Sequence, residues 1–278
     1  MRIYKLIGLI SVMGLCACSE INLPEATHEY VDFSTVISES RATDVKFDNN
    51  DKIGVFAMVD NGYNKPGSLE DNPYAANVPY IYNGSKFTAM NEGIELINNN
   101  DKFFYYAIYP YSSNLSNKFE FECRKDQSDY SNYTLSDLMV SYTDYSSNEK
   151  SIELKFIHIL SKVVVNLEYS GIEIYNFTLK NFFYKSDLDL YDGTITTINN
   201  KIADIVMCTN GSKSFKAVVP AQTIKKGTTF ATISTNVGNY TVTASNDIKL
   251  GMGNLNNIYI RINTSRSNNS LQCEMLLK

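Results

Sequence analysis

The fold class is decided by residues 151–169, SIELKFIHILSKVVVNLEY. The first part alternates apolar and polar side chains, with Ile152, Leu154 and Phe156 on one side. A period of two residues is that of a β-strand with one buried face. Residues 163–165 are wholly apolar, as in a strand that is covered on both faces. We interpret the whole segment as the longest β-strand region of the chain.

Shorter segments of the same kind lie on both sides of it. Residues 52–59 form a near-continuous apolar run, and residues 103–109 are rich in Phe and Tyr. Asn83-Gly84 lies between two apolar runs, which is a strong hairpin signal. No segment keeps a 3.6-residue apolar period over three turns, so helix is expected only in short pieces. Strands at intervals of about 8–12 residues are typical of β-sandwiches.

Roughly fifteen such strands exceed one ordinary sandwich. We therefore predict an all-β chain of two β-sandwich domains in series, the first at residues 42–150 and the second at residues 151–278. Upstream of them, residues 19–40 are polar and acidic. They contain one weakly apolar piece, Tyr30 to Ile37, which is a possible strand.

The composition limits the classes of function. The formal net charge is −5 and no basic stripe stands out, which argues against nucleic acid as a partner. The chain has 20 Tyr and 14 Phe but no Trp. Beyond the first twenty residues its cysteines are Cys123, Cys208 and Cys273, which lie far apart and lack metal-ligand spacing. Core packing is the expected role of Cys123 and Cys208.

The N-terminal residues have the layout expected of an export signal. A short basic start precedes an apolar run from Leu6 to Leu15 that is too short to span a membrane. The next residues, Leu15-Cys16-Ala17-Cys18, resemble the lipobox of bacterial lipoproteins, with Cys18 in the lipidated position. We expect residues 1–17 to be a signal peptide and residues 18–41 a lipidated tether. The alternative is an ordinary secretory signal with a chance cysteine.

Nothing in the sequence indicates catalysis. The two histidines, His28 and His158, do not make a zinc site, which needs three or four ligands. Asp187 and Asp189 are two residues apart on an extended segment and could face one side, where a calcium role is a minor alternative. We expect no enzyme activity, no metal and no cofactor. Most aromatic side chains of residues 103–109 are expected in the core, because a continuous run points to both faces of a strand.

The C-terminal segment 271–278 is a candidate donor strand. Leu271, Cys273, Met275 and Leu277 would lie on one face of a strand that follows a polar spacer. Burial of the larger side chains contributes about 1.5–3 kcal/mol each. Ordering the backbone costs about 1–2 kcal/mol per residue, so ladder hydrogen bonds decide the balance. The alternative is that this strand folds back onto its own domain.

A series of short motifs resembles the fimbrillin family of Bacteroidales, the type V pilins and their relatives. The motifs occur in the expected order over about residues 41 to 263. They are RAT at 41–43, DKIGVFA at 51–57, FYYAIYP at 104–110, SDLM at 136–139, LKFIHILSKV at 154–163, VPAQT at 219–223 and GNLNNIY at 253–259. The chain departs from the usual pattern by lacking Trp.

The resemblance implies two transthyretin-like, Greek-key sandwiches and a maturation pathway. The lipid would carry the subunit to the outer membrane, where a trypsin-like protease would cut between Arg41 and Ala42. The cut would remove the lipid and a strand, and the groove would accept a strand from a neighbouring subunit. Anchor-type members of the family keep the lipid. Without the resemblance, Arg41 would be only a solvated linker residue.

We therefore expect a structural or accessory subunit of a cell-surface fimbrium with a role in adhesion. Its expected partners are other pilin subunits, the outer membrane through the lipid, and a receptor on a host or bacterial surface. The expected location is the outer membrane, the extracellular fimbrium, or both. The main alternative is a surface glycan-binding lipoprotein for polysaccharide uptake, with residues 103–109 as its stacking platform. A weaker alternative is a structural lipoprotein that faces the periplasm.

Overall fold

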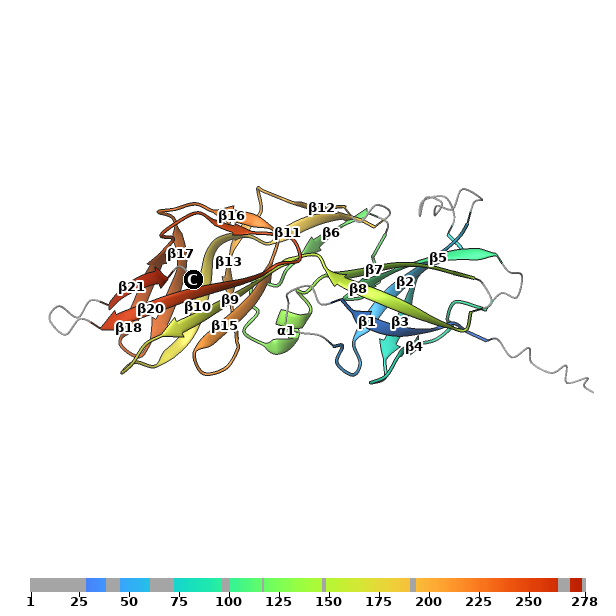
Figure 1. Cartoon of the computed structure of the whole chain (residues 1–278), viewed down its shortest axis with the longest axis horizontal. Coiled ribbons are helices and arrows are strands. Elements are labelled where there is room, and N and C mark those ends of the chain that lie inside the picture. The colour runs from blue at the N-terminus through green and yellow to red at the C-terminus, as the bar shows by residue number, and fades with distance from the viewer. Residues whose placement is uncertain are drawn as a thin grey trace, which may run out of the picture.

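The chain is elongated, with a closed barrel at one end and a group of smaller sheets at the other (Figure 1). A computed structural model describes residues 29–38, 46–60, 73–96, 101–116, 118–146, 149–190, 194–264 and 271–276. These residues form β-strands and one short helix, α1 (Tyr130–Thr134). The prediction of an all-β chain is confirmed. No helix within these residues is long and apolar enough to cross a membrane.

Seven strands close the barrel. Around it they are β1 (Asp32–Ile37), β4 (Phe87–Ala89), β3 (Ala75–Tyr82), β2 (Lys52–Val59), β5 (Lys102–Tyr109), β7 (Met139–Ser146) and β8 (Ser151–His158). The hairpin predicted at Asn83-Gly84 is confirmed, since Tyr82 lies opposite Phe87. There the side-chain oxygen of Asn83 accepts hydrogen bonds from the backbone of Ser85 and Lys86.

The remaining strands form four sheets, which we call the C-terminal sheets. One has the order β13 (Ile202–Val206), β10 (Ile174–Phe183), β17 (Thr229–Thr235), β18 (Gly238–Thr243). Another has β14 (Cys208–Thr209), β15 (Ser214–Val219), β9 (Ser161–Glu168), β20 (Leu255–Thr264), β21 (Leu271–Leu276). The small ones are β12 (Thr194–Thr197), β11 (Lys185–Asp189), β6 (Lys118–Glu122), and the pair β16 (Gln222–Ile224), β19 (Ile248–Leu250).

The domain boundary predicted between residues 150 and 151 falls within the barrel. It separates β7 from β8, yet these strands pair in one barrel, with Met139 opposite His158. The segment 151–169 is in fact two strands in two sheets, and the break between them falls after His158. In addition, β6 comes from the predicted first domain but pairs with β11 among the C-terminal sheets. Alternation shows which side of a strand is buried, but it does not show which sheet the strand joins.

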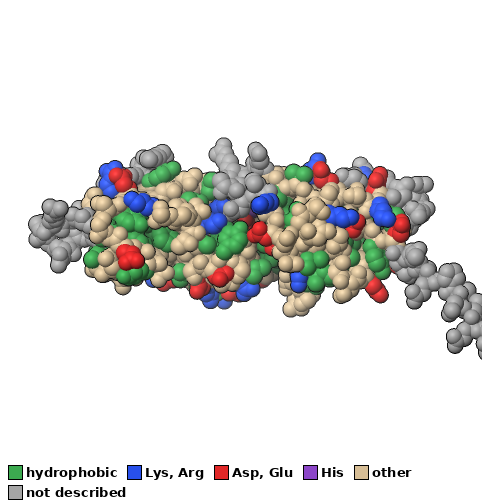
Figure 2. Space-filling view, turned by 90° about the horizontal axis from the view of Figure 1, so that it is seen from below, with side chains coloured by type: hydrophobic (Ala, Val, Ile, Leu, Met, Phe, Trp, Pro, Cys, Tyr) green, Lys and Arg blue, Asp and Glu red, His purple; other side chains and the backbone are tan. Residues whose placement is uncertain are grey.

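The aromatic strand β5 is buried on both faces. Phe103, Tyr105 and Tyr109 lie in the core of the barrel. Phe104 and Tyr106 point the other way, into a second core that also contains Leu188 of β11 and the buried side chains of the C-terminal sheets. The barrel and the C-terminal sheets therefore share packed apolar contacts. On the face that Figure 2 shows, acidic and basic side chains are interspersed and apolar ones form small separate groups.

Candidate assembly site

Strand β1 occupies a slot in the barrel between β8 and β4. It runs parallel to β8, from Asp32 opposite Ser151 to Ile37 opposite Phe156. On its other side it pairs with β4 only at Phe33, opposite Phe87. At the two ends of the slot, the Asp32 N–H donates to the Lys150 carbonyl and the Ser38 N–H donates to the Phe156 carbonyl, each at 2.9 Å. The strand is thus held chiefly by its ladder with β8.

The inward side chains of β1 complete the core of the barrel. Val31, Phe33 and Ile37 are buried. The Phe33 ring lies edge-on to two tyrosines, with centroid distances of 4.8 Å to Tyr80 and 5.6 Å to Tyr105. Burying such side chains contributes roughly 1.5–3 kcal/mol each, so loss of β1 would destabilise the barrel by several kcal/mol.

The walls of this slot are apolar and uncharged at neutral pH. Burial raises the pKa of the Tyr80 and Tyr105 hydroxyls well above their usual range. The Tyr80 hydroxyl accepts a hydrogen bond of 2.8 Å from the Ile94 N–H, which fixes its ring against Phe33. A strand that replaces β1 must therefore present apolar side chains to these rings.

Charged contacts add little to the hold on β1. Lys86 Nζ lies 2.6 Å from Asp32 Oδ2, and Lys150 Nζ lies 3.1 Å from Glu29 Oε1. The Lys150 pair is largely in solvent and the Lys86 pair is partly exposed, and an exposed ion pair contributes about 0–1 kcal/mol. The outward Val36 is 47% exposed. Shape and the backbone ladder thus decide what fits the slot.

The predicted maturation residues fall outside the described residues. These are Cys18, Arg41 and Ala42. Ser38 is the last described residue after β1, and the chain is described again from Lys46. Arg41-Ala42 therefore separates β1 in sequence from every other strand of the barrel. A cut at that bond would leave β1 held only by noncovalent contacts.

The candidate donor segment forms β21, the edge strand of its sheet. It pairs antiparallel with β20, from Leu271 opposite Thr264 to Leu276 opposite Tyr259. In the free chain the backbone thus has the folded-back arrangement that was the alternative to donation. The side chains of Leu271, Cys273 and Met275, and all of Leu277, lie outside the described part of the chain. Their role in donation stays a prediction.

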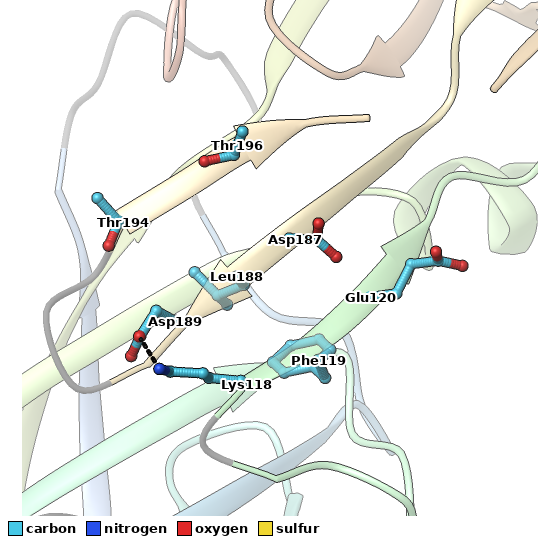
Figure 3. Close-up of a pocket in the computed structure, with 8 residues that line it drawn as sticks. All are labelled: Lys118, Phe119, Glu120, Asp187, Leu188, Asp189, Thr194 and Thr196. Atoms are coloured by element: carbon cyan, nitrogen blue, oxygen red, sulfur yellow. Dashed lines mark ion pairs between the residues drawn. The ribbon is translucent and has the colours of Figure 1, made fainter. Parts of the chain in front are cut away.

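The other polar candidates have ordinary partners. His158 Nδ1 lies 2.9 Å from Asp137 Oδ1, and both side chains are largely buried where the barrel meets α1. Figure 3 shows Asp187 and Asp189 on one side of β11, as expected, beside a hollow of about 360 Å³. Asp189 lies 3.3 Å from Lys118 Nζ. Within the described residues, no group of three His, Cys, Asp or Glu side chains could hold a metal ion.

The sequence did not reveal the central role of Phe33. The segment from Tyr30 to Ile37 is predicted only as a possible strand, because its charged and polar residues mask the pattern. The signal is present, since Val31, Phe33, Thr35 and Ile37 alternate with residues that point outward. The stacking platform considered at residues 103–109 is not formed, because all its aromatic rings are buried.

These features define a class of all-β protein in which an N-terminal strand completes a barrel. A family model described as fimbrillin-like matches residues 40–275, so the chain belongs to the fimbrillin-like family. This confirms the resemblance seen in the sequence motifs.

Solved structures share the fold. One, described as a candidate cell adhesion protein of Bacteroides ovatus, is 13% identical with a TM-score of 0.63 and covers 90% of this chain and 96% of its own. Another, described in the same way, from Bacteroides uniformis, is 17% identical with a TM-score of 0.61 and covers 88% and 98%. No curated protein matches the sequence.

Proposed function

We propose that this chain is a structural or accessory subunit of a cell-surface fimbrium, with a role in adhesion, and that it is assembled by strand donation after export as a lipoprotein. Membership of the fimbrillin-like family supports the fimbrial role. The paired β-sheets of the described residues fit a structural part.

One observation carries the proposal. Strand β1 lies upstream of Arg41 in sequence but fills the core of a barrel whose other strands all lie downstream. Cleavage between Arg41 and Ala42 would convert β1 into a separate peptide. Its release would expose the edge of β8 and the aromatic walls around Phe33. An exposed apolar edge of this kind is a template for a strand from another subunit.

The pathway has four steps. The lipid on Cys18 carries the chain to the outer membrane, and cleavage after Arg41 removes the lipid and β1. A strand of another pilin subunit then fills the slot, and the extracellular fimbrium grows. A subunit that keeps its lipid would serve as an anchor. The finished fimbrium would meet receptors on host or bacterial surfaces.

The deciding experiment is the mass of the chain recovered from its native cell surface. We expect a chain that begins at Ala42 and carries no lipid, assembled into SDS-resistant ladders. Arg41→Ala should give a chain that begins at acylated Cys18 and does not polymerise. Arg124→Ala, which changes an exposed arginine elsewhere, is the matched control and should mature normally. Ladders of equal length from the Arg41→Ala chain would contradict the proposal.

A further inference from the structure

The outer face of the four-stranded sheet that contains β10 carries a row of hydroxyl groups. Thr178 in β10 lies opposite Thr232 in β17, and Thr232 lies opposite Thr241 in β18. All three are at least partly exposed. Their neighbours Phe177 and Ile233 are buried, because successive side chains of a strand point to opposite faces. Three threonines, which we call the threonine row, therefore stand side by side on the outer face.

A second row beside the threonines is also uncharged. Ser234 lies opposite both Asn176 and Asn239, and all three are at least partly exposed. Within the part of the chain that the structure describes, the six side chains of the two rows make no hydrogen bond to other residues. Their donors and acceptors are thus open to a ligand that carries many hydroxyl groups.

The same face of β10 leads into a hollow. Two residues after Thr178, Lys180 lines a hollow of about 430 Å³ that lies between β10, β16 and the start of β17. Sites for small molecules have volumes of about 300–1,000 Å³. Figure 1 shows β10, β16 and β17 among the C-terminal sheets, away from β1 in the barrel. The hollow is therefore separate from the slot of β1.

Hydrogen bonds fix the lining of this hollow. The Phe183 N–H donates to Gln222 Oε1 at 2.9 Å, and Gln222 Nε2 donates to the Phe183 carbonyl at 3.2 Å. Asn181 has a φ of 60°, in the left-handed region that asparagine tolerates better than most residues. Its N–H donates to Asp204 Oδ1 at 3.2 Å. The partly exposed Phe183 and the Asn181 main chain are thus held in place before any ligand binds.

The charged side chains of the lining are both lysines. Lys180 pairs with Asp204, and Lys225 Nζ lies 2.8 Å from Asp247 Oδ2. Neither aspartate lines the hollow. An ammonium group has three N–H donors, so each lysine can bind an anion while it keeps its aspartate. The hollow therefore presents positive charge to a ligand.

A sugar acid combines the groups that this lining can bind. The C–H face of a sugar ring suits the apolar side chains of Phe183 and Ile224, and its hydroxyls suit the Asn181 amide. Its carboxylate suits the two lysines, because charge-assisted hydrogen bonds are the stronger ones. A simple phosphate would use only the lysines, and an apolar ligand would leave them without a role.

We propose that the hollow binds one uronic acid unit of an acidic polysaccharide, and that neighbouring units of the same polymer run along the two rows. Lys180 and Lys225 bind the carboxylate, Phe183 packs against the ring, and the threonine row binds hydroxyls of the following units. This inference rests on the adhesive role in the proposed function, whose receptor it specifies. Binding needs neither cleavage nor assembly, so it is measured on the full, uncleaved chain.

The first test is calorimetric titration with polygalacturonate, with dextran as the neutral polymer. We expect Lys180→Gln, Lys225→Gln to raise the Kd for polygalacturonate at least about tenfold. The matched control is Lys118→Gln, Lys155→Gln, which removes two exposed lysines that also pair with carboxylates, at 3.3 Å and 3.6 Å. Its Kd should stay within about twofold of wild type, because these lysines lie outside the hollow. Equal losses in the two double variants would mean general attraction by charge and would overturn the site.

The second test replaces the threonine row. Thr178→Val, Thr232→Val, Thr241→Val keeps the β-branched shape and removes three hydroxyls, so the urea unfolding midpoint should be unchanged. We expect the Kd for polygalacturonate to rise at least about fivefold. An unchanged Kd would overturn the path along the rows. If wild type does not bind polygalacturonate, or binds dextran equally well, the proposal fails. Fimbriae of normal length would still form in that case, so such a failure is distinct from failure of the proposed function.

Discussion

The side-chain amide of Gln127 pairs with the main chain of Val218 in both directions. Gln127 Nε2 donates to the Val218 carbonyl at 2.8 Å, and the Val218 N–H donates to Gln127 Oε1 at 2.9 Å. Gln127 is fully buried. In sequence it lies between β6 and α1, whereas Val218 lies in β15. The side chain therefore continues the edge of a C-terminal sheet and ties it to the segment that leads back to the barrel.

Replacing Gln127 should loosen this junction. Gln127→Ala leaves a buried donor and a buried acceptor on Val218 without partners, and each costs about 1–3 kcal/mol. We expect the free energy of unfolding in urea to fall by about 2–4 kcal/mol. Gln127→Glu keeps the shape but buries a carboxylate and removes the donor, so it should not restore stability. Asn91→Ala, at an exposed amide, is the control. A loss below about 0.5 kcal/mol for Gln127→Ala would show that water replaces the pairing.

Phe33 should dominate the contribution of β1 to stability. Phe33→Ala leaves a cavity between Tyr80 and Tyr105 and should lower the free energy of unfolding of the uncleaved chain by about 3–5 kcal/mol. Val36→Ala, on the exposed side of the same strand, should change it by less than about 0.5 kcal/mol. Urea unfolding of the two variants checks this. Equal effects would mean that β1 is not packed in the barrel in solution.

The sequence predicted strands better than sheets. The alternation at Ile152, Leu154 and Phe156 correctly indicated a half-buried strand, because burial of one face is a local property. The alternation did not show that the chain changes sheet after His158, between β8 and β9. Nor did the sequence show that Lys118 lies opposite Asp189. Strand pairing joins residues far apart in the chain, and the local pattern carries no information about the partner strand. Cys18, Arg41 and Ala42 stay predictions from motifs.

The contributions of two aspartates, Asp51 and Asp129, to the free energy of unfolding should change with pH in opposite directions. Burial raises the pKa of Asp51, although hydrogen bonds from the Asp48 N–H and the Tyr109 hydroxyl oppose the effect. The folded state therefore holds a proton on Asp51 more tightly than the unfolded state does. The contribution of Asp51 to stability is largest below the unfolded pKa of about 3.9 and falls as pH rises through the folded pKa.

The pKa of Asp129 is lowered by hydrogen bonds from the Ser131 hydroxyl and the Ser131 N–H at the start of α1. Its contribution is present above about pH 3.9 and is lost as pH falls through the folded pKa. Unfolding free energies measured from pH 3 to 7 for wild type, Asp51→Asn and Asp129→Asn check both signs. The free energy of unfolding of wild type, relative to that of Asp51→Asn, should fall as pH rises. Relative to that of Asp129→Asn, it should increase as pH rises. Slopes of the same sign would contradict the assignment.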